Sequence, residues 1–238
     1  VLLVGGIGVT GAVASFLAQK TATIATLKCL GAPGRLVFGL YMGQVLAMAL
    51  IGVVAGCAAG AAMPLLAGAL GGTALPVRPI AALYPMPLAL AALFGMLTAA
   101  TFALWPVARA REIPAAALFR DAVQPVTQRP KAAYLWAAVA GVALLAGLTL
   151  ATSVDRWFAG WFIAGALATL GLLYAGAKLV MHVARGRRIA AGSALRLAVA
   201  NLHRPGAATT GVVLSLGLGL SVLAATMLIE GNLSRQIT

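Results

Sequence analysis

Long stretches without a charged residue constrain this chain more than any other feature. Each stretch can supply a helix of roughly 20 residues, the length that crosses the hydrocarbon core of a bilayer. No segment alternates apolar and polar residues over about ten positions, as membrane-spanning strands do. The sequence therefore predicts an all-α, polytopic transmembrane protein with about six spans and no β domain. The six stretches run from Val1 to Gln19, Leu36 to Val77, Pro79 to Ala108, Ala132 to Val154, Trp157 to Ala177 and Pro205 to Ile229.

The two ends of the sequence lead us to expect a fragment of a longer protein. The first apolar stretch begins at residue 1 with no charge before it, and that residue is not Met. At the other end, a polar tail from Glu230 to Thr238 leaves the last stretch and then stops.

Basic residues are concentrated in alternate connections between the apolar stretches. Lys20 to Arg35, Arg109 to Lys131 and Lys178 to Arg204 together hold 14 of the 17 Lys and Arg residues. The positive-inside rule places these three connections in the cytoplasm, and the connections at Arg78 and at 153–156 outside. This distribution also accounts for the net charge of +13 without a nucleic-acid partner.

The second apolar stretch is longer than one span requires. We predict a helix to about Met63, followed by a non-helical outer segment that begins around Pro64. Glycine and proline are typical of such a loop, and here they are Gly71, Gly72, Pro76, Pro79, Pro85 and Pro87.

The sequence lacks the groups that most membrane-embedded chemistry requires. Its four acidic residues, Glu112, Asp121, Asp155 and Glu230, all fall in connections or at span ends. Carriers driven by protons or sodium usually need an ionisable group near the bilayer midplane. Residues 6–11 match GxGxxG, but no strand precedes them, so they do not indicate a dinucleotide site. We predict no catalytic residue, no cofactor, no metal ligand and no ATP site in this chain.

Gly52, Gly56 and Gly60 form two consecutive GxxxG steps within the second stretch. Small residues at this spacing allow another helix backbone to approach closely. We therefore predict that these glycines serve helix packing.

The connection of residues 19–35 contains a short amphipathic helix. Ile24, Leu27 and Leu30 recur at helical spacing, and Gly31 and Pro33 are expected to stop the helix. Two interpretations are open at this point. The helix either rests on lipid or docks a cytoplasmic partner.

Three segments resemble parts of FtsX-like ABC permeases. Lys20 to Ala32, with its core IATLKCLGA, is similar to the segment that follows the second transmembrane helix of that family. Gly95 to Arg120 resembles the final helix and basic tail of the permease module. Leu195 to Pro205, LRLAVANLHRP, resembles the entry of a second module. Their order resembles the two-module subgroup associated with lysophospholipase-linked export, which is related to macrolide-exporter and lipoprotein-releasing permeases.

The resemblance implies a domain organisation and a coupling site. Residues 1–121 correspond to the C-terminal three-helix part of a first module, 122–192 to a linking pair of helices, and 193–238 to the truncated start of a second module. In the family, a separate cytoplasmic ATPase dimer grips the short helix after the second transmembrane helix. Carried over, the coupling residues are Thr21, Ile24, Leu27, Lys28 and Leu30.

The resemblance further implies a permease subunit in the bacterial inner membrane, with the ATPase activity in a partner subunit. Its cargo would be a lipid, lipoprotein or other amphiphile handled at the outer face. The alternative is a non-transporting scaffold that uses ATP to activate an extracytoplasmic hydrolase. Half of a secondary transporter is a third interpretation, which the lack of intramembrane charges disfavours.

Overall fold

The computed structural model describes residues 2–70, 85–114, 132–186 and 209–237. Within these ranges every regular element is an α-helix, which confirms the predicted all-α class. The helices are α1 (Leu2–Gln19), α2 (Thr21–Cys29), α3 (Gly34–Leu70), α4 (Pro85–Arg111), α5 (Ala132–Thr152), α6 (Arg156–Gly186) and α8 (Thr209–Ile237).

Five of these helices, α1, α3, α4, α5 and α6, are long and apolar enough to cross a membrane. The sixth expected span corresponds to α8, in which a shorter apolar stretch runs from Leu216 to Asn232. The described residues thus contain five of the six predicted spans by length and composition, and the sixth is a helix with a shorter apolar stretch.

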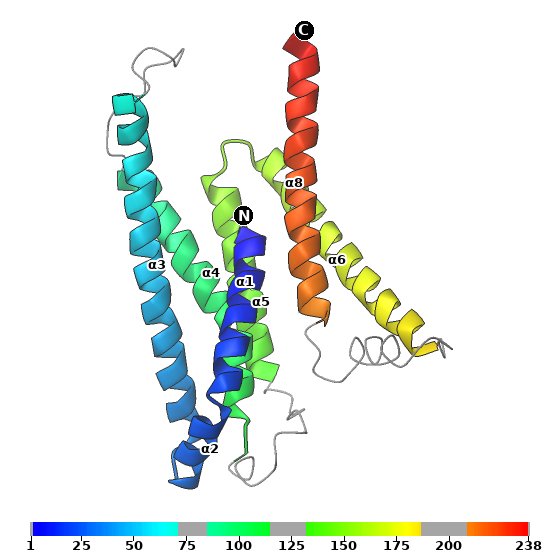
Figure 1. The fold of residues 1–238 in the computed structure, drawn as a ribbon. Helices are drawn as coiled ribbons and strands as arrows, with labels where there is room; N and C mark the ends of the chain where they lie inside the picture. Colours follow the sequence, from blue (N-terminus) through cyan, green and yellow to red (C-terminus); the bar gives the residue numbers. More distant parts are fainter. Residues whose placement is uncertain (1, 71–84, 115–131, 187–208, 238) are drawn as a thin grey trace.

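The long helices alternate in direction, as the charge pattern requires (Figure 1). Helix α2 lies at the lower end of the view, where α4 ends and α5 begins. Lys20, Lys28, Arg35, Arg109 and Arg111 all belong to this end, which we call the basic end. The last turns of α3 and the turn between α5 and α6 lie at the opposite end (Figure 1).

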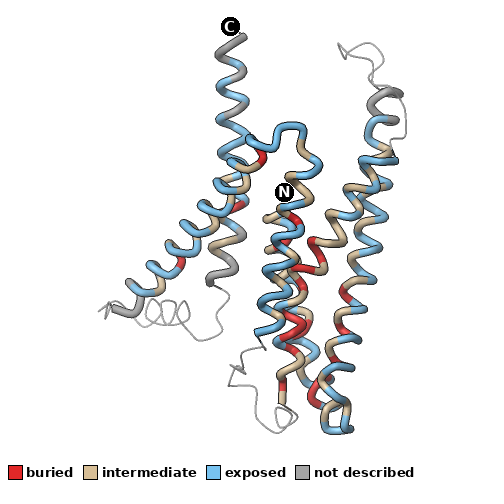
Figure 2. The backbone as a smooth tube through the Cα atoms, turned by 180° about the vertical axis from the view of Figure 1, so that it is seen from behind, coloured by how far each residue is buried: buried red, intermediate tan, exposed pale blue. Residues whose placement is uncertain are grey.

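Helix α4 is the centre of the packed part of the molecule. It contacts α1, α3 and α5, whereas α6 packs mainly against α8, and α8 also contacts α1. Figure 2 shows that buried residues concentrate along α1, α3 and α4, and that α6 and α8 are mostly exposed. Helices α5 and α6 therefore form only a loose pair, because α6 diverges from α5 after the turn (Figure 1).

The prediction that the helix ends before Pro64 is wrong, since α3 continues through this proline to Leu70. Transmembrane helices tolerate proline because nearby groups can satisfy the backbone groups that it frees. Pro85 and Pro87, also expected in a loop, lie in the first turn of α4. The first N–H groups of a helix have no partner within it, so proline removes no hydrogen bond there. The other loop residues, Gly71, Gly72, Pro76 and Pro79, lie outside the described residues.

The three glycines of the GxxxG steps do not contact another helix in the described part of this chain. A Cβ atom built at Gly52, Gly56 or Gly60 meets nothing within 4 Å. These glycines face open space in the described part of the chain, and their role in helix packing stays a prediction. The close approaches use other glycines, where a Cβ atom would lie 2.5 to 2.9 Å from a side chain of a neighbouring helix: Gly6, Gly95, Gly141 and Gly217.

Candidate functional site

Helix α2 is a separate short element, which Lys20 separates from α1 and which ends before Gly31. At its start, the Thr21 hydroxyl donates to the carbonyl oxygen of Ala18, 2.8 Å away, in the last turn of α1. At its end, Gly31 adopts a φ of +89°, a conformation that glycine takes without strain. The Ala32 amide then donates to the Leu27 carbonyl at 3.0 Å, a bond typical of a left-handed helix ending. The predicted short helix and its stop at Gly31 are confirmed.

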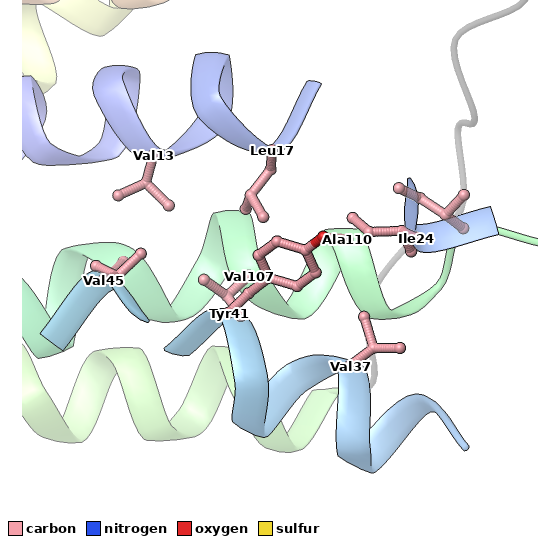
Figure 3. Packing of buried hydrophobic residues seen from close by; sticks show 10 residues of the cluster. Val13, Leu17, Ile24, Val37, Tyr41, Val45, Val107 and Ala110 are labelled. Atoms are coloured by element: carbon pink, nitrogen blue, oxygen red, sulfur yellow. The ribbon is translucent and has the colours of Figure 1, made fainter. Parts of the chain in front are cut away.

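One face of α2 points into the protein. Thr21, Ile24, Ala25 and Lys28 follow the i, i+3, i+4, i+7 spacing of a single helical face. Ile24 and Ala25 are fully buried, with 0% exposure. Figure 3 shows side chains of α1, α3 and α4 converging with Ile24 at the basic end. The buried cluster contains Val13, Leu17, Ile24, Val37, Tyr41, Val45, Ala103, Val107, Ala110 and Ile113.

The opposite face of α2 points away from the bundle. It carries Thr23, Thr26, Leu27 and Leu30, which repeat the same spacing two residues later, about 200° around the helix. Leu30 is 80% exposed, whereas Leu27 is half-buried. The short helix thus has an inward face that holds it to the spans and an outward face that is open to a partner.

The five predicted coupling residues therefore divide between the two faces. Each three-residue step turns a side chain back by about 60°, so Leu30 lies about 120° from Ile24 around the helix. Because Ile24 is buried within this chain, it cannot be the surface anchor for a partner that the apolar spacing suggested. Leu27 and Leu30 remain candidates for that contact, and Thr21 and Lys28 belong to the inward side with Ile24.

Lys28 ties α2 to the end of α4. Its Nζ donates hydrogen bonds to the carbonyl oxygens of Arg111 and Ile113. Carbonyls at a helix C-terminus have no partner within the helix, and a cation there also interacts favourably with the helix dipole. The carbonyl end of α4 is therefore held by the short helix that precedes α3.

Burial of Lys28 lowers its pKa from the ordinary value of 10.5. Loss of solvent contact is the largest cause, because it disfavours the charged amine. The Glu112 carboxylate opposes this shift, and the Arg111 guanidinium adds to it.

Two residues of this site were not among the sequence-based candidates. Ile113 is a member of the buried cluster, and Arg111 supplies a carbonyl to Lys28. The sequence held a weak signal for both, since basic residues are favoured in the last helical turn and a proline at 114 follows the helix. Among the described residues no group of three or more His, Cys, Asp or Glu side chains lies together, so we assign no metal ligands.

The site lies within a segment of the chain that matches a known protein family. Residues 1–115 match the family model described as FtsX-like permease C-terminal. Residues 1–115 are therefore similar to the C-terminal part of FtsX-like permeases. The matched segment contains α1 to α4 and therefore the whole short helix with its contacts. No curated protein and no solved structure matches the chain.

This similarity covers 115 of the 238 residues. FtsX-like permeases are membrane components of ABC transporters, in which the ATPase is a separate subunit. The membrane-spanning helices agree with a multi-pass membrane protein of this kind.

Proposed function

We propose that this chain is part of the permease subunit of an ABC system in the bacterial inner membrane, and that α2 is its contact with a cytoplasmic ATPase dimer. The observation that carries the proposal is the two-faced arrangement of α2. Its inward residues Ile24 and Lys28 are bound to the spans, while Leu30 is open on the other side.

This arrangement suits the transmission of a displacement. A partner that pushes on the outward face moves an element whose inward face is packed against α1, α3 and α4. The contact shifts the permease between states only if the partner binds those states with different free energies. Nucleotide-driven closure of an ATPase dimer supplies such a difference, because its surfaces move relative to the membrane.

The cargo that we propose is a lipid, lipoprotein or other amphiphile handled at the outer face of the membrane. Support comes from the resemblance of residues 193–238 to the start of a second module. Helix α8, in this segment, packs beside α1 of the first module, as two modules of one permease would. Residues 122–192 then form a linking pair, and the two-module organisation favours the export-linked subgroup.

The test is co-purification of the ATPase with full-length protein that carries Leu30→Asp. Because Leu30 is 80% exposed, the substitution should leave the fold intact while it places a charge at the proposed contact. We expect a loss of at least about tenfold in bound ATPase, which corresponds to about 1.4 kcal/mol of binding free energy.

Val154→Asp is the matched control. Val154 is fully exposed in the turn between α5 and α6, at the end opposite to α2. This variant introduces the same charge and should retain the ATPase. Full retention of the ATPase by Leu30→Asp would contradict the coupling role of α2.

A further inference from the structure

Arg111 joins several helices at the basic end. It is the last residue of α4, and its carbonyl oxygen accepts a hydrogen bond from Lys28 of α2. Its side chain extends to α5, where Nη1 donates to the hydroxyl oxygen of Tyr134. It also passes close to α3, since a Cβ atom at Gly34 would lie 3.1 Å from the Arg111 Cγ. A single residue thus contacts α2 through its main chain and α5 through its side chain.

The Arg111 guanidinium group also lies over the Tyr134 ring. The Arg111 Cζ lies 5.7 Å from the centroid of the Tyr134 ring, within the range of a cation–π interaction. Phe38 of α3 also packs against this tyrosine, with its ring centroid 5.2 Å from that of Tyr134. A lysine would lack the fork that donates to the hydroxyl group while its plane approaches the ring.

We propose that Arg111 is a positioning residue that fixes the start of α5 to α2, so that a displacement of α2 moves α5 together with α4. This inference rests on the proposed coupling function of α2. It extends that function beyond the family segment of residues 1–115, because Tyr134 lies outside it. Helix α5 of the linking pair then takes part in coupling and does not merely connect two modules.

The structure offers a way to break this link without dissolving the bundle. Arg111→Gln keeps the main-chain carbonyl that Lys28 binds, so the contact between α2 and α4 remains. The middle of α5 stays packed on α4, where Gly141 accommodates Thr101 at close range. The variant therefore removes the tie between α2 and the start of α5 while other contacts of α5 persist.

The experiment measures the distance between spin labels on α2 and α5. Labels are placed at Ala22→Cys and Ala133→Cys, both exposed, in full-length protein that carries Cys29→Ser and Cys57→Ala. Ala22 belongs to neither the inward nor the outward face of α2, so its label leaves the proposed ATPase contact intact. With wild-type Arg111 we expect a narrow distance distribution that is the same with and without ATP in the ATPase complex. Arg111→Gln should broaden it by about twofold and make it sensitive to ATP, because the two helices no longer move together.

Two further variants separate a specific contact from general loosening. Tyr134→Phe retains the ring and loses the hydroxyl, so an intermediate width is expected. Arg109→Gln removes an exposed cation from the same helical turn and should leave the distribution unchanged. Arg111→Lys should not restore the narrow distribution, since it keeps the charge without the planar fork.

The outcomes distinguish this inference from the proposed function. A distribution for Arg111→Gln as narrow as that of the wild type, with no response to ATP, would overturn the positioning role. Failure of any ATPase to co-purify would instead overturn the coupling function of α2. The width measured without nucleotide would still report whether Arg111 holds α5 to α2.

Discussion

The two ends of α3 carry equally regular spacing but pack in opposite ways. At the basic end, Val37, Tyr41 and Val45 repeat every four residues and are buried in the cluster beneath α2. Farther along, Gly52, Gly56 and Gly60 repeat at the same interval and meet no neighbour in the described chain. The same spacing therefore indicates a helix face in both places, but it does not reveal which face meets protein.

The row of side chains that begins with Val37, Tyr41 and Val45 continues along α3. Its course explains why the glycine steps meet no neighbour. Further four-residue steps from Val45 reach Val53 and Cys57, which contact α4. Val53 Cγ2 would be 2.9 Å from a Cβ atom at Gly95, and Cys57 Sγ lies 3.8 Å from the Leu88 carbonyl oxygen. Each glycine of the GxxxG steps is offset by one residue from this row of side chains, so the glycines lie about 100° away from the row around the helix. In this contact α3 supplies the larger side chain, Val53, and α4 supplies the glycine that makes room for it, Gly95.

The largest effect should come from removing the side chain at the centre of the buried end. Ile24→Ala is expected to lower the free energy of unfolding by about 2–5 kcal/mol, because it leaves a cavity where Ile24 has 0% exposure. Thermal unfolding of the purified protein in detergent would measure the change. Leu30→Ala, on the exposed side of the same helix, should stay within about 0.5 kcal/mol of wild type. Equal losses for the two variants would contradict the two-faced assignment of α2.

Next in size is the tie between α2 and the end of α4. Lys28→Met keeps the aliphatic length but removes the hydrogen bonds to the carbonyls of Arg111 and Ile113. We expect a loss of about 1.5–3 kcal/mol, the range for hydrogen bonds that involve a charged group. Lys20→Met, at an exposed position just before α2, serves as the control in the same unfolding assay. If Lys28→Met is as stable as the wild type, the lysine hydrogen bonds to these carbonyls contribute nothing to the free energy of unfolding, because water binds the carbonyls equally well.

A pair of glycine substitutions tests the comparison of close-packed and open glycines directly. In Gly6→Ala the new Cβ would lie 2.5 Å from Cε2 of the Phe102 ring, so either the ring must shift or α1 and α4 must move apart. Overpacking of this kind costs about 1–3 kcal/mol. Gly56→Ala meets open space and should be neutral or slightly stabilising for the monomer. If Gly56→Ala instead weakens association with another chain, the open glycines pack between subunits.

A smaller effect is expected from the polar contact between α1 and α4. The Thr10 hydroxyl lies 3.1 Å from the Phe102 carbonyl oxygen and equally far from that of Gly6 in its own helix. Thr10→Val preserves the shape and should cost about 0.6 kcal/mol, the average for interhelical hydrogen bonds in membranes. Thr169→Val on α6, where the hydroxyl donates only within its own helix at 2.9 Å, is the matched control. A larger loss for Thr169→Val would argue against the interhelical bond.

The smallest effect concerns pH. The pKa of Lys28 is lowered in the folded protein, so the unfolded chain binds the proton more tightly. Stability should therefore rise slightly as the pH climbs through the lowered pKa toward 10.5, and this gain should be absent at lower pH. The measurement is the difference in melting temperature between wild type and Lys28→Met at several alkaline pH values. A difference that moves in the other direction would mean that the hydrogen-bonded carbonyls outweigh desolvation.

Much of the fold and part of the site followed from the sequence. The apolar stretches predicted the helices, and Gly31 marked the end of α2 because a left-handed turn there favours glycine. Proline was a poorer guide, since Pro64 lies within α3 and Pro85 begins α4. Local rules weigh a proline by its lost hydrogen bond, but at a helix start that bond is missing anyway.

The assignment of α2 shows where sequence reasoning on the site reached its limit. Apolar residues every three positions correctly indicated a helix, yet they grouped Ile24 with Leu30, which lie on different sides. The lysine could be assigned to no partner, because its carbonyl acceptors lie 83 and 85 residues farther along the chain. Contacts of that sequence separation leave no local pattern.

By itself, the sequence determined that the chain forms apolar helices long enough to cross a membrane and that a short helix lies between the first two of them. It also predicted that the basic connections share one side. Only the tertiary structure decided which faces of those helices meet, that Gly6 and Gly95 rather than Gly52 and Gly56 admit a neighbour, and that Lys28 binds the end of α4. The physical reason is that both lipid and protein interiors are apolar. A helix that is hydrophobic on every side has no amphipathic pattern that identifies its packed face. The shapes of the side chains and a few hydrogen bonds therefore decide which face packs against protein.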